Sequence, residues 1–224
     1  MESVYWQHRI WPTDNTSAKP AFDTIMPDEI MRAKVEDELR KSNALELLWK
    51  RELTGAMLQA EIDRIARDTK KPELIQEIWE ALVNNPYLVA ECFARPLLID
   101  RLTRNWYAFD SRFHSELKAK AEGELASYSI YNLRSMSGDY SEIHYFLDNN
   151  NHSLALKKNT NIDRIYVTEE EFKEIESTLE QSGSLQEDEH QFYITRFKNN
   201  RTGQIDVEYM VWKKVPFEQW WQEH

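Results

Sequence analysis

The stretch from residue 53 to residue 107 constrains the fold most strongly, because several helix-start signals follow one another in it. Thr54 is suited to cap a helix that begins just after it, since its hydroxyl can accept from a free N–H of the first turn. Pro72, Pro86 and Pro96 each stand where a further helix is expected to begin. Proline suits the first turn because its missing N–H would have no partner there. The stretch therefore predicts four consecutive helices.

Apolar spacing extends this helical reading in both directions. Apolar residues at helical intervals after Pro27 predict another helix, over about residues 28–49. The helix from Pro96 is expected to be the longest and to run without interruption to about residue 124. Its apolar side comprises Leu98, Leu102, Trp106, Phe109, Phe113 and Leu117.

The second half of the chain changes to an alternating pattern. Apolar and polar residues alternate over 143–147, 192–197 and 205–211, which predicts three strands. Thr168 is suited to cap a helix that ends near residue 181, before the helix-stopping Gly183. Pro216 is expected to open a short final helix.

Together these patterns predict an α+β fold in two parts. Residues 1–125 form a mostly helical half, and residues 126–224 form a smaller half with an antiparallel sheet. The final helix carries Trp220 and Trp221, which we expect to dock back onto the helical half.

Charge and composition exclude several classes of function. The net charge of -11 repels phosphate, so we expect no nucleic-acid partner. No apolar run reaches the length of a membrane span, so we expect no membrane insertion. The single cysteine, Cys92, excludes an intrachain disulfide and is interpreted as a buried structural thiol. No leader is evident, which predicts a cytoplasmic protein if Met1 is native and a periplasmic or secreted one if an export signal was removed.

The helical half resembles the N-terminal, peptide-binding domain of the SurA/PrsA-type chaperone–foldase family. The similarity rests on the helices that start at Thr54 and Pro72, on the Asn-Asn-Pro-Tyr link at 84–87, and on Phe-Ala-Arg-Pro-Leu-Leu at 93–98. The resemblance implies a protein that holds a polypeptide or peptide ligand.

The second half is similar to a reduced parvulin, the peptidyl-prolyl isomerase module of that family. The best-matching parts are the helix at 168–181, the Gly-Ser-Leu step at 183–185 and the run 187–197. A parvulin site has a close pair of histidines beneath a pocket for the proline ring. Here the resemblance places His144 at one of these positions and Tyr193 at the other, and the glycine-rich segment of the family is missing between residues 149 and 161.

The resemblance therefore implies a peptide-binding chaperone or foldase with weak or lost isomerase activity. His144 and Tyr193 are the catalytic candidates, because a pocket with one hydrogen-bond donor can lower the imide rotation barrier of about 18–20 kcal/mol. Phe192 is expected beside them, at one end of a cleft between the two halves. Three further substrate-binding candidates are expected to line the other end: Trp6, Trp11 and Trp106.

Two alternatives stay open. The same scaffold could be an enzyme that acts on a small or peptidic substrate in the inter-domain cleft, or a structural domain of a larger assembly. His144, His152 and His190 are possible metal ligands, but they do not have the spacing of a zinc motif. We expect neither a metal ion nor another cofactor.

Overall fold

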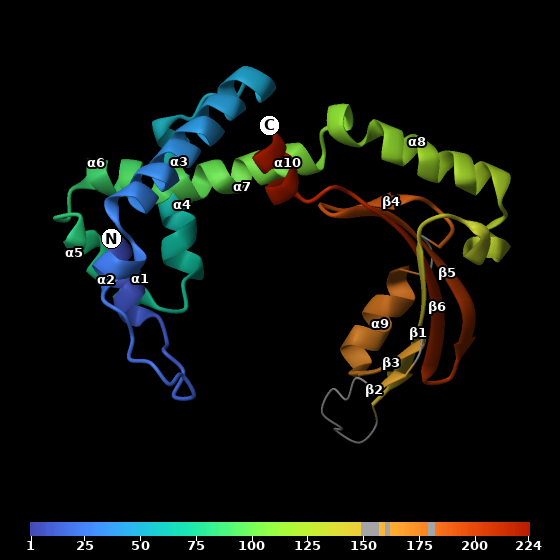
Figure 1. Ribbon diagram of the computed structural model, residues 1–224. Coiled ribbons are helices and arrows are strands. Elements are labelled where there is room, and N and C mark those ends of the chain that lie inside the picture. Colours follow the sequence, from blue (N-terminus) through green and yellow to red (C-terminus); the bar gives the residue numbers. More distant parts are fainter. Residues whose placement is uncertain (149–156, 160–161, 179–181) are drawn as a thin grey trace. The chain divides into compact units, whose positions relative to one another are not determined.

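The computed structural model describes residues 1–148, 157–159, 162–178 and 182–224 (Figure 1). These residues form two compact units, Met1–Trp106 and Tyr107–His224. The sequence analysis divides the chain at residue 125. That residue lies inside a helix of the second unit, Ser111–Ser127, and is C-terminal to the boundary between the two units. Unit 1 is helical and unit 2 carries the sheet, so the predicted α+β class is confirmed.

Unit 1 consists of helices that begin where the sequence signals stand. Thr54 Oγ1 accepts a hydrogen bond from the backbone N–H of Met57, as a capping residue should. Pro72 and Pro86 each occupy a first helical position. In chain order the elements are α1 (Glu2–His8), α2 (Phe22–Ile25), α3 (Asp28–Trp49), α4 (Gly55–Asp68), α5 (Pro72–Ala81), α6 (Pro86–Leu88), the π-helical turn η1 (Val89–Ala94) and α7 (Arg95–Ala108), whose last two residues belong to unit 2.

The apolar core of unit 1 joins α1, α5 and η1. Its buried members are Val4, Ile78, Val89 and Phe93. A buried carboxylate, Glu61 of α4, adds a polar link to α7 through Arg101, at 2.7 Å. The long helix α3 contributes little to this core, because only its carboxyl end, with Leu45 and Trp49, is buried.

The long helix predicted from Pro96 is wrong in one respect, because the chain breaks it in two. Helix α7 ends at Ala108, and α8 (Ser111–Ser127) begins after Asp110. The Asp110 carboxylate accepts from the backbone N–H of Arg112, so this residue caps a new helix. The apolar stripe continues through the break, which is why spacing alone did not reveal it.

Unit 2 is built on a mixed sheet. The strand order is β2-β3-β1-β6-β5-β4. Every neighbouring pair is antiparallel except β1 and β3, which are parallel, so the expectation of a purely antiparallel sheet needs this correction. The elements after α8 are η2 (Ile130–Ser135), β1 (Asp139–Leu147), β2 (Lys157–Asn159), β3 (Ile162–Val167), α9 (Glu169–Ser177), β4 (Gln186–Glu187), β5 (Gln191–Arg201), β6 (Gln204–Lys213) and α10 (Phe217–Glu223).

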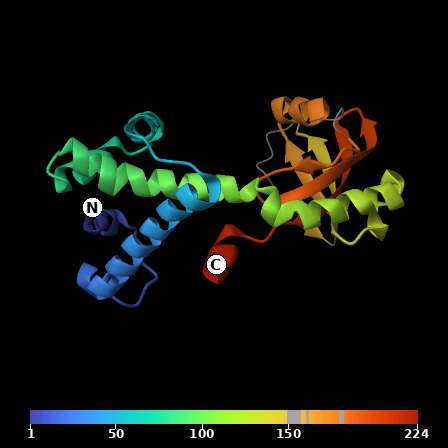
Figure 2. The ribbon, with the colours of Figure 1, turned by 90° about the horizontal axis from the view of Figure 1, so that it is seen from above.

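Helices cover both faces of this sheet (Figure 2). On one face, α9 places Phe172 against Ile205 and Val207 of β6. On the other, α8 and η2 cover Met210 and Trp212 of the same strand. This follows from the strand period of two, which sends successive side chains of β6 to opposite faces.

The last helix of unit 2 packs on the turn between α7 and α8. The Trp220 ring lies 4.6 Å from that of Tyr107 and 4.8 Å from that of Phe113. The Tyr107 hydroxyl donates to the carbonyl oxygen of Val215 at 2.8 Å, and burial raises the pKa of Tyr107 to about 12. These contacts give Trp220 a structural role, and Trp221 stacks on Phe217 of the same helix, with ring centroids 5.7 Å apart.

Candidate functional site

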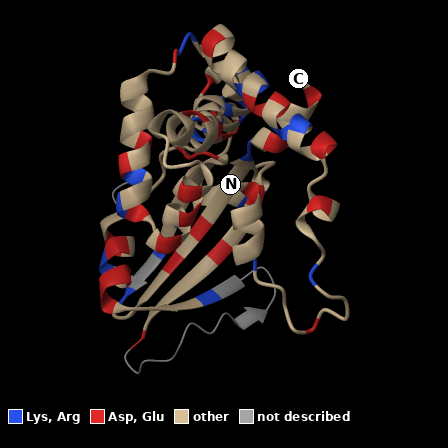
Figure 3. Cartoon of the chain, turned by 90° about the vertical axis from the view of Figure 1, so that its left-hand side faces the viewer, with Lys and Arg blue, Asp and Glu red and all other residues tan. Residues whose placement is uncertain are grey.

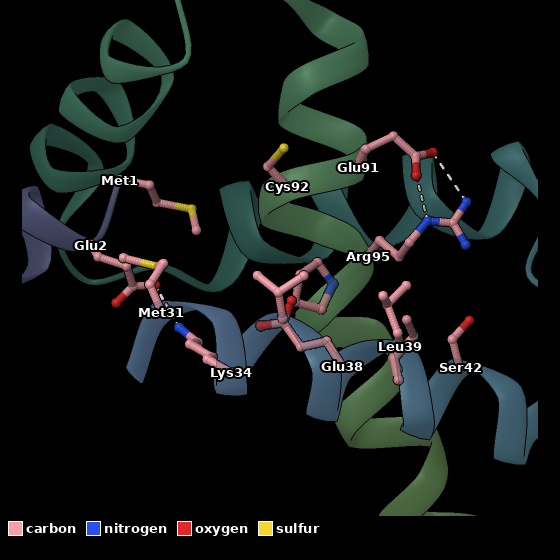
Figure 4. Close-up of a pocket in the computed structure, with 13 residues that line it drawn as sticks. Met1, Glu2, Met31, Lys34, Glu38, Leu39, Ser42, Glu91, Cys92 and Arg95 are labelled. Atoms are coloured by element: carbon pink, nitrogen blue, oxygen red, sulfur yellow. Dashed lines mark hydrogen bonds and ion pairs between the residues drawn. The ribbon is translucent and has the colours of Figure 1, made fainter. Parts of the chain in front are cut away.

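A cavity of about 500 Å³ lies in unit 1 between α3 on one side and η1 with the start of α7 on the other (Figure 4). Helix α3 contributes the apolar side chains of Met31, Val35 and Leu39. Pro96 and Ile99 of α7 contribute to the opposite wall. A volume of about 300–1,000 Å³ is typical of ligand pockets, so this cavity has room for several apolar side chains.

The apolar side chains of α3 at this cavity are open to solvent. Val35 is 47% exposed and Leu39 is 59% exposed, whereas Leu45, further along the same helix, is fully buried. The sequence pattern predicts one continuous apolar stripe on this helix. Only its carboxyl end is covered by described residues, and the remainder forms one wall of the cavity.

Charged residues also line the cavity, and most of them are paired with one another. Lys34 donates to Glu2 at 2.5 Å, and Arg95 donates to both oxygens of Glu91, at 2.6 and 3.1 Å (Figure 4). The half-buried Glu38 has no hydrogen-bond or ion-pair partner among the described residues. Burial raises the pKa of this carboxyl, because removal from water disfavours the charged form.

A second cavity, of about 230 Å³, continues along α3. Glu38, Cys92 and Pro96 line both cavities, so the two cavities form one groove along α3. Cys92 is exposed there, which corrects the interpretation of a buried thiol. It lies in the π-helical turn η1, where the wider backbone turn shifts the facing of side chains away from the α-helical pattern.

A further cavity, of about 490 Å³, lies elsewhere in unit 1, where α4 and α5 meet the start of α6 and η1. Leu58, Ile62 and Trp79 line it, with Tyr87, 71% exposed, at its edge. The indole nitrogen of Trp79 is buried without a hydrogen-bond partner among the described residues.

The structure places His144 in a network of ion pairs on the sheet. Its Nδ1 lies 2.5 Å from Oδ1 of Asp206, and its Nε2 lies 3.6 Å from Oε1 of Glu142. Both ring nitrogens thus face a carboxylate. Arg134 and Lys198 also reach Glu142, at 3.4 and 3.3 Å.

The same network continues to the next carboxylate of β6. Glu208 accepts from the hydroxyl of Tyr140 at 2.8 Å and lies 3.1 Å from Nε of Arg196. Burial raises the pKa of Tyr140 to about 12. Figure 3 shows acidic residues on the strands as well as on the helices. Cations balance the carboxylates of this network, which is the arrangement of a structural ion-pair cluster.

Tyr193 lies on the opposite face of the sheet from His144. It is paired in register with Val211, while His144 is paired with Asp206. Positions 206 and 211 of β6 differ by an odd number, so their side chains and those of their partners point to different faces. The structure therefore does not bring the two catalytic candidates together, and the predicted close pair is absent.

The four aromatic candidates are divided between the two units, with Phe192 in unit 2 and the three tryptophans in unit 1. Phe192 is 1% exposed and packs in the core with Met210 and Trp212, so it offers no surface to a ligand. Trp6 and Trp11 are neighbours, with ring centroids 6.2 Å apart. Their indole nitrogens donate to backbone carbonyls, at 3.1 and 2.9 Å.

Trp106, the fourth aromatic candidate, is partly buried and carries the guanidinium of Arg51 at 4.5 Å from its ring centroid. None of the four lines the groove along α3. The groove residues Val35, Leu39 and Glu38 were not among the site candidates. The sequence signal that could have pointed to these residues was the carboxylate of Glu38, which stands within the apolar stripe of the helix.

Within the described ranges, no group of three or more His, Cys, Asp or Glu side chains is placed to hold a metal ion. His152, one of the possible metal ligands, lies outside the described ranges. None of the helices that the structure describes combines the length and apolarity of a membrane span.

Comparisons with protein-family models, with curated proteins and with solved structures gave no significant match.

Proposed function

We propose that this protein is a peptide-binding, chaperone-like protein whose helical unit holds an extended apolar segment. The observation that carries the proposal is the groove along α3, where Val35 and Leu39 stay open to solvent beside a cavity of about 500 Å³. Exposed apolar surface of this kind costs free energy unless a partner covers it. A hydrophobic groove can accept the apolar side chains of a bound peptide.

The charge of the chain suits such a role. A protein that carries exposed apolar side chains is prone to self-association, and a net charge of -11 opposes that association. The peptide would bind by apolar contact inside the groove, while the acidic surface keeps the complex soluble.

Prolyl isomerisation is weak or lost in this proposal. Both ring nitrogens of His144 face carboxylates, and Tyr193 points to the other face of the sheet. A parvulin-like site formed by these two side chains is therefore disfavoured. We expect a proline-containing test peptide to isomerise no faster with the protein than without it.

The test uses Cys92, the single cysteine, which is exposed on the groove. A short fluorescent peptide of alternating leucine and glutamine is titrated with the protein, before and after alkylation with a bulky maleimide. We expect alkylation to abolish the rise in anisotropy that binding produces. Cys92→Ser, treated with the same reagent, is the matched control and should still bind.

Circular dichroism of the alkylated protein checks that the helices are intact. Unchanged peptide binding after complete alkylation would refute the groove as the binding site. Absence of binding by the untreated protein would refute the proposed function.

A further inference from the structure

The groove along α3 carries one carboxylate that forms no ion pair with any described residue. Glu2 and Glu91 are each bonded to a basic side chain within the groove. Glu38 lines both cavities of the groove and has no ion-pair partner among the described residues. Figure 4 shows the same contrast, with dashed lines at the two pairs and none at Glu38.

The two lysines nearest to Glu38 on its own helix are bonded to other groups. Lys34 donates to Glu2 at 2.5 Å. Lys41 lies 3.0 Å from Asp37 and 2.8 Å from Asp100. Both lysines weaken the negative potential at Glu38, but neither bonds its carboxylate. A half-buried carboxylate without a partner is costly, and an incoming cation would reduce that cost.

We propose that the groove prefers peptide segments in which lysine or arginine stands beside apolar residues, with Glu38 receiving the cation. This inference rests on the proposed function and adds the class of ligand to it. The apolar side chains fill the cavity against Leu39, and the basic side chain extends its methylene stem along the apolar wall to reach the carboxylate. Because burial raises the pKa of Glu38, a bound cation should lower it again.

The experiment compares three peptides of equal length, with leucine at alternate positions and glutamine between, in which one central glutamine is kept or is replaced by lysine or glutamate. Affinity is measured by anisotropy for wild type, for Glu38→Gln and for Glu36→Gln. Glu36 lies exposed on the same helix without lining the groove, so its variant makes the same change in net charge.

In wild type we expect the lysine peptide to bind about fivefold more tightly than the glutamine peptide, which corresponds to one ion pair of about 1 kcal/mol. Glu38→Gln should reduce this ratio nearly to one, and Glu36→Gln should leave it almost unchanged. Equal ratios in the two variants would overturn the role of Glu38. Failure of all three peptides to bind wild type, the neutral one included, would overturn the proposed function itself.

Discussion

Lys214 provides the sharpest test of how unit 2 is held together. Its side chain is 1% exposed, and its ammonium makes three contacts of 2.7–2.8 Å. Two are to the carbonyl oxygens of Ala108 and Asp188, and the third is to the carboxylate of Glu187. The side chain of Lys214, which directly follows β6, thus contacts the last residue of α7 and the residues at the end of β4.

Lys214→Met keeps the apolar stem and removes the charge. The two carbonyls lose a donor, at a cost of about 1 kcal/mol each. Glu187 loses its cation but remains about one-third exposed, so water replaces part of that interaction. We expect the free energy of unfolding to fall by about 3 kcal/mol.

Urea denaturation, followed by tryptophan fluorescence, measures the change. A loss of this size lowers the urea midpoint by about 1–2 M. The neighbouring Lys213→Met is the matched control, because Lys213 is 70% exposed and its pair with Asp139 is open to water. Equal urea midpoints for the two variants would show that the buried contacts of Lys214 do not stabilise unit 2.

Two further predictions concern Glu61 and Tyr193. Hydrogen bonding by Arg64 holds the pKa of Glu61 below its ordinary value of 4.5, so the stability contributed by Glu61 is present above that pH and is lost as the pH falls through the folded pKa. Glu61→Gln should therefore lower the free energy of unfolding by about 1–2 kcal/mol at neutral pH and by progressively less below pH 4.5. Urea titration at several pH values measures this difference. A difference that stays constant with pH would contradict the stabilising role of the Glu61 charge. Tyr193→Phe should leave both the melting temperature and peptide binding unchanged, whereas a slower prolyl isomerisation in this variant would restore Tyr193 to a catalytic role.

The sequence predicted most elements because their signals are local. Thr54, Pro72 and Pro216 each mark a helix start through the backbone geometry of the first turn, and the structure has a helix at each. The break at Asp110 was also marked locally, by a capping residue. The apolar stripe on both sides of it suggested continuity instead.

The site was far less predictable, because it depends on which face each residue occupies and on what covers it. The resemblance paired His144 with Tyr193, but register on β1 and β5 sends them to opposite faces. The spacing of Leu39 and Leu45 is equally helical, yet one is exposed and the other is buried. No local pattern states whether a second element covers an amphipathic helix, so the groove could be found only from the fold.

Peptide binding by two leucine variants of α3 shows whether the groove is the binding site. Leu39 lines the cavity and is 59% exposed, while Leu47 is 65% exposed on the same helix and does not line it. Glutamate at either position changes the charge and the helix propensity equally, and it should cost little stability at such exposed sites. We expect Leu39→Glu to weaken binding of the leucine–glutamine peptide at least about tenfold, a loss of ~1.4 kcal/mol. Leu47→Glu should bind like wild type, and equal affinities for the two variants would show that the peptide does not bind in the groove.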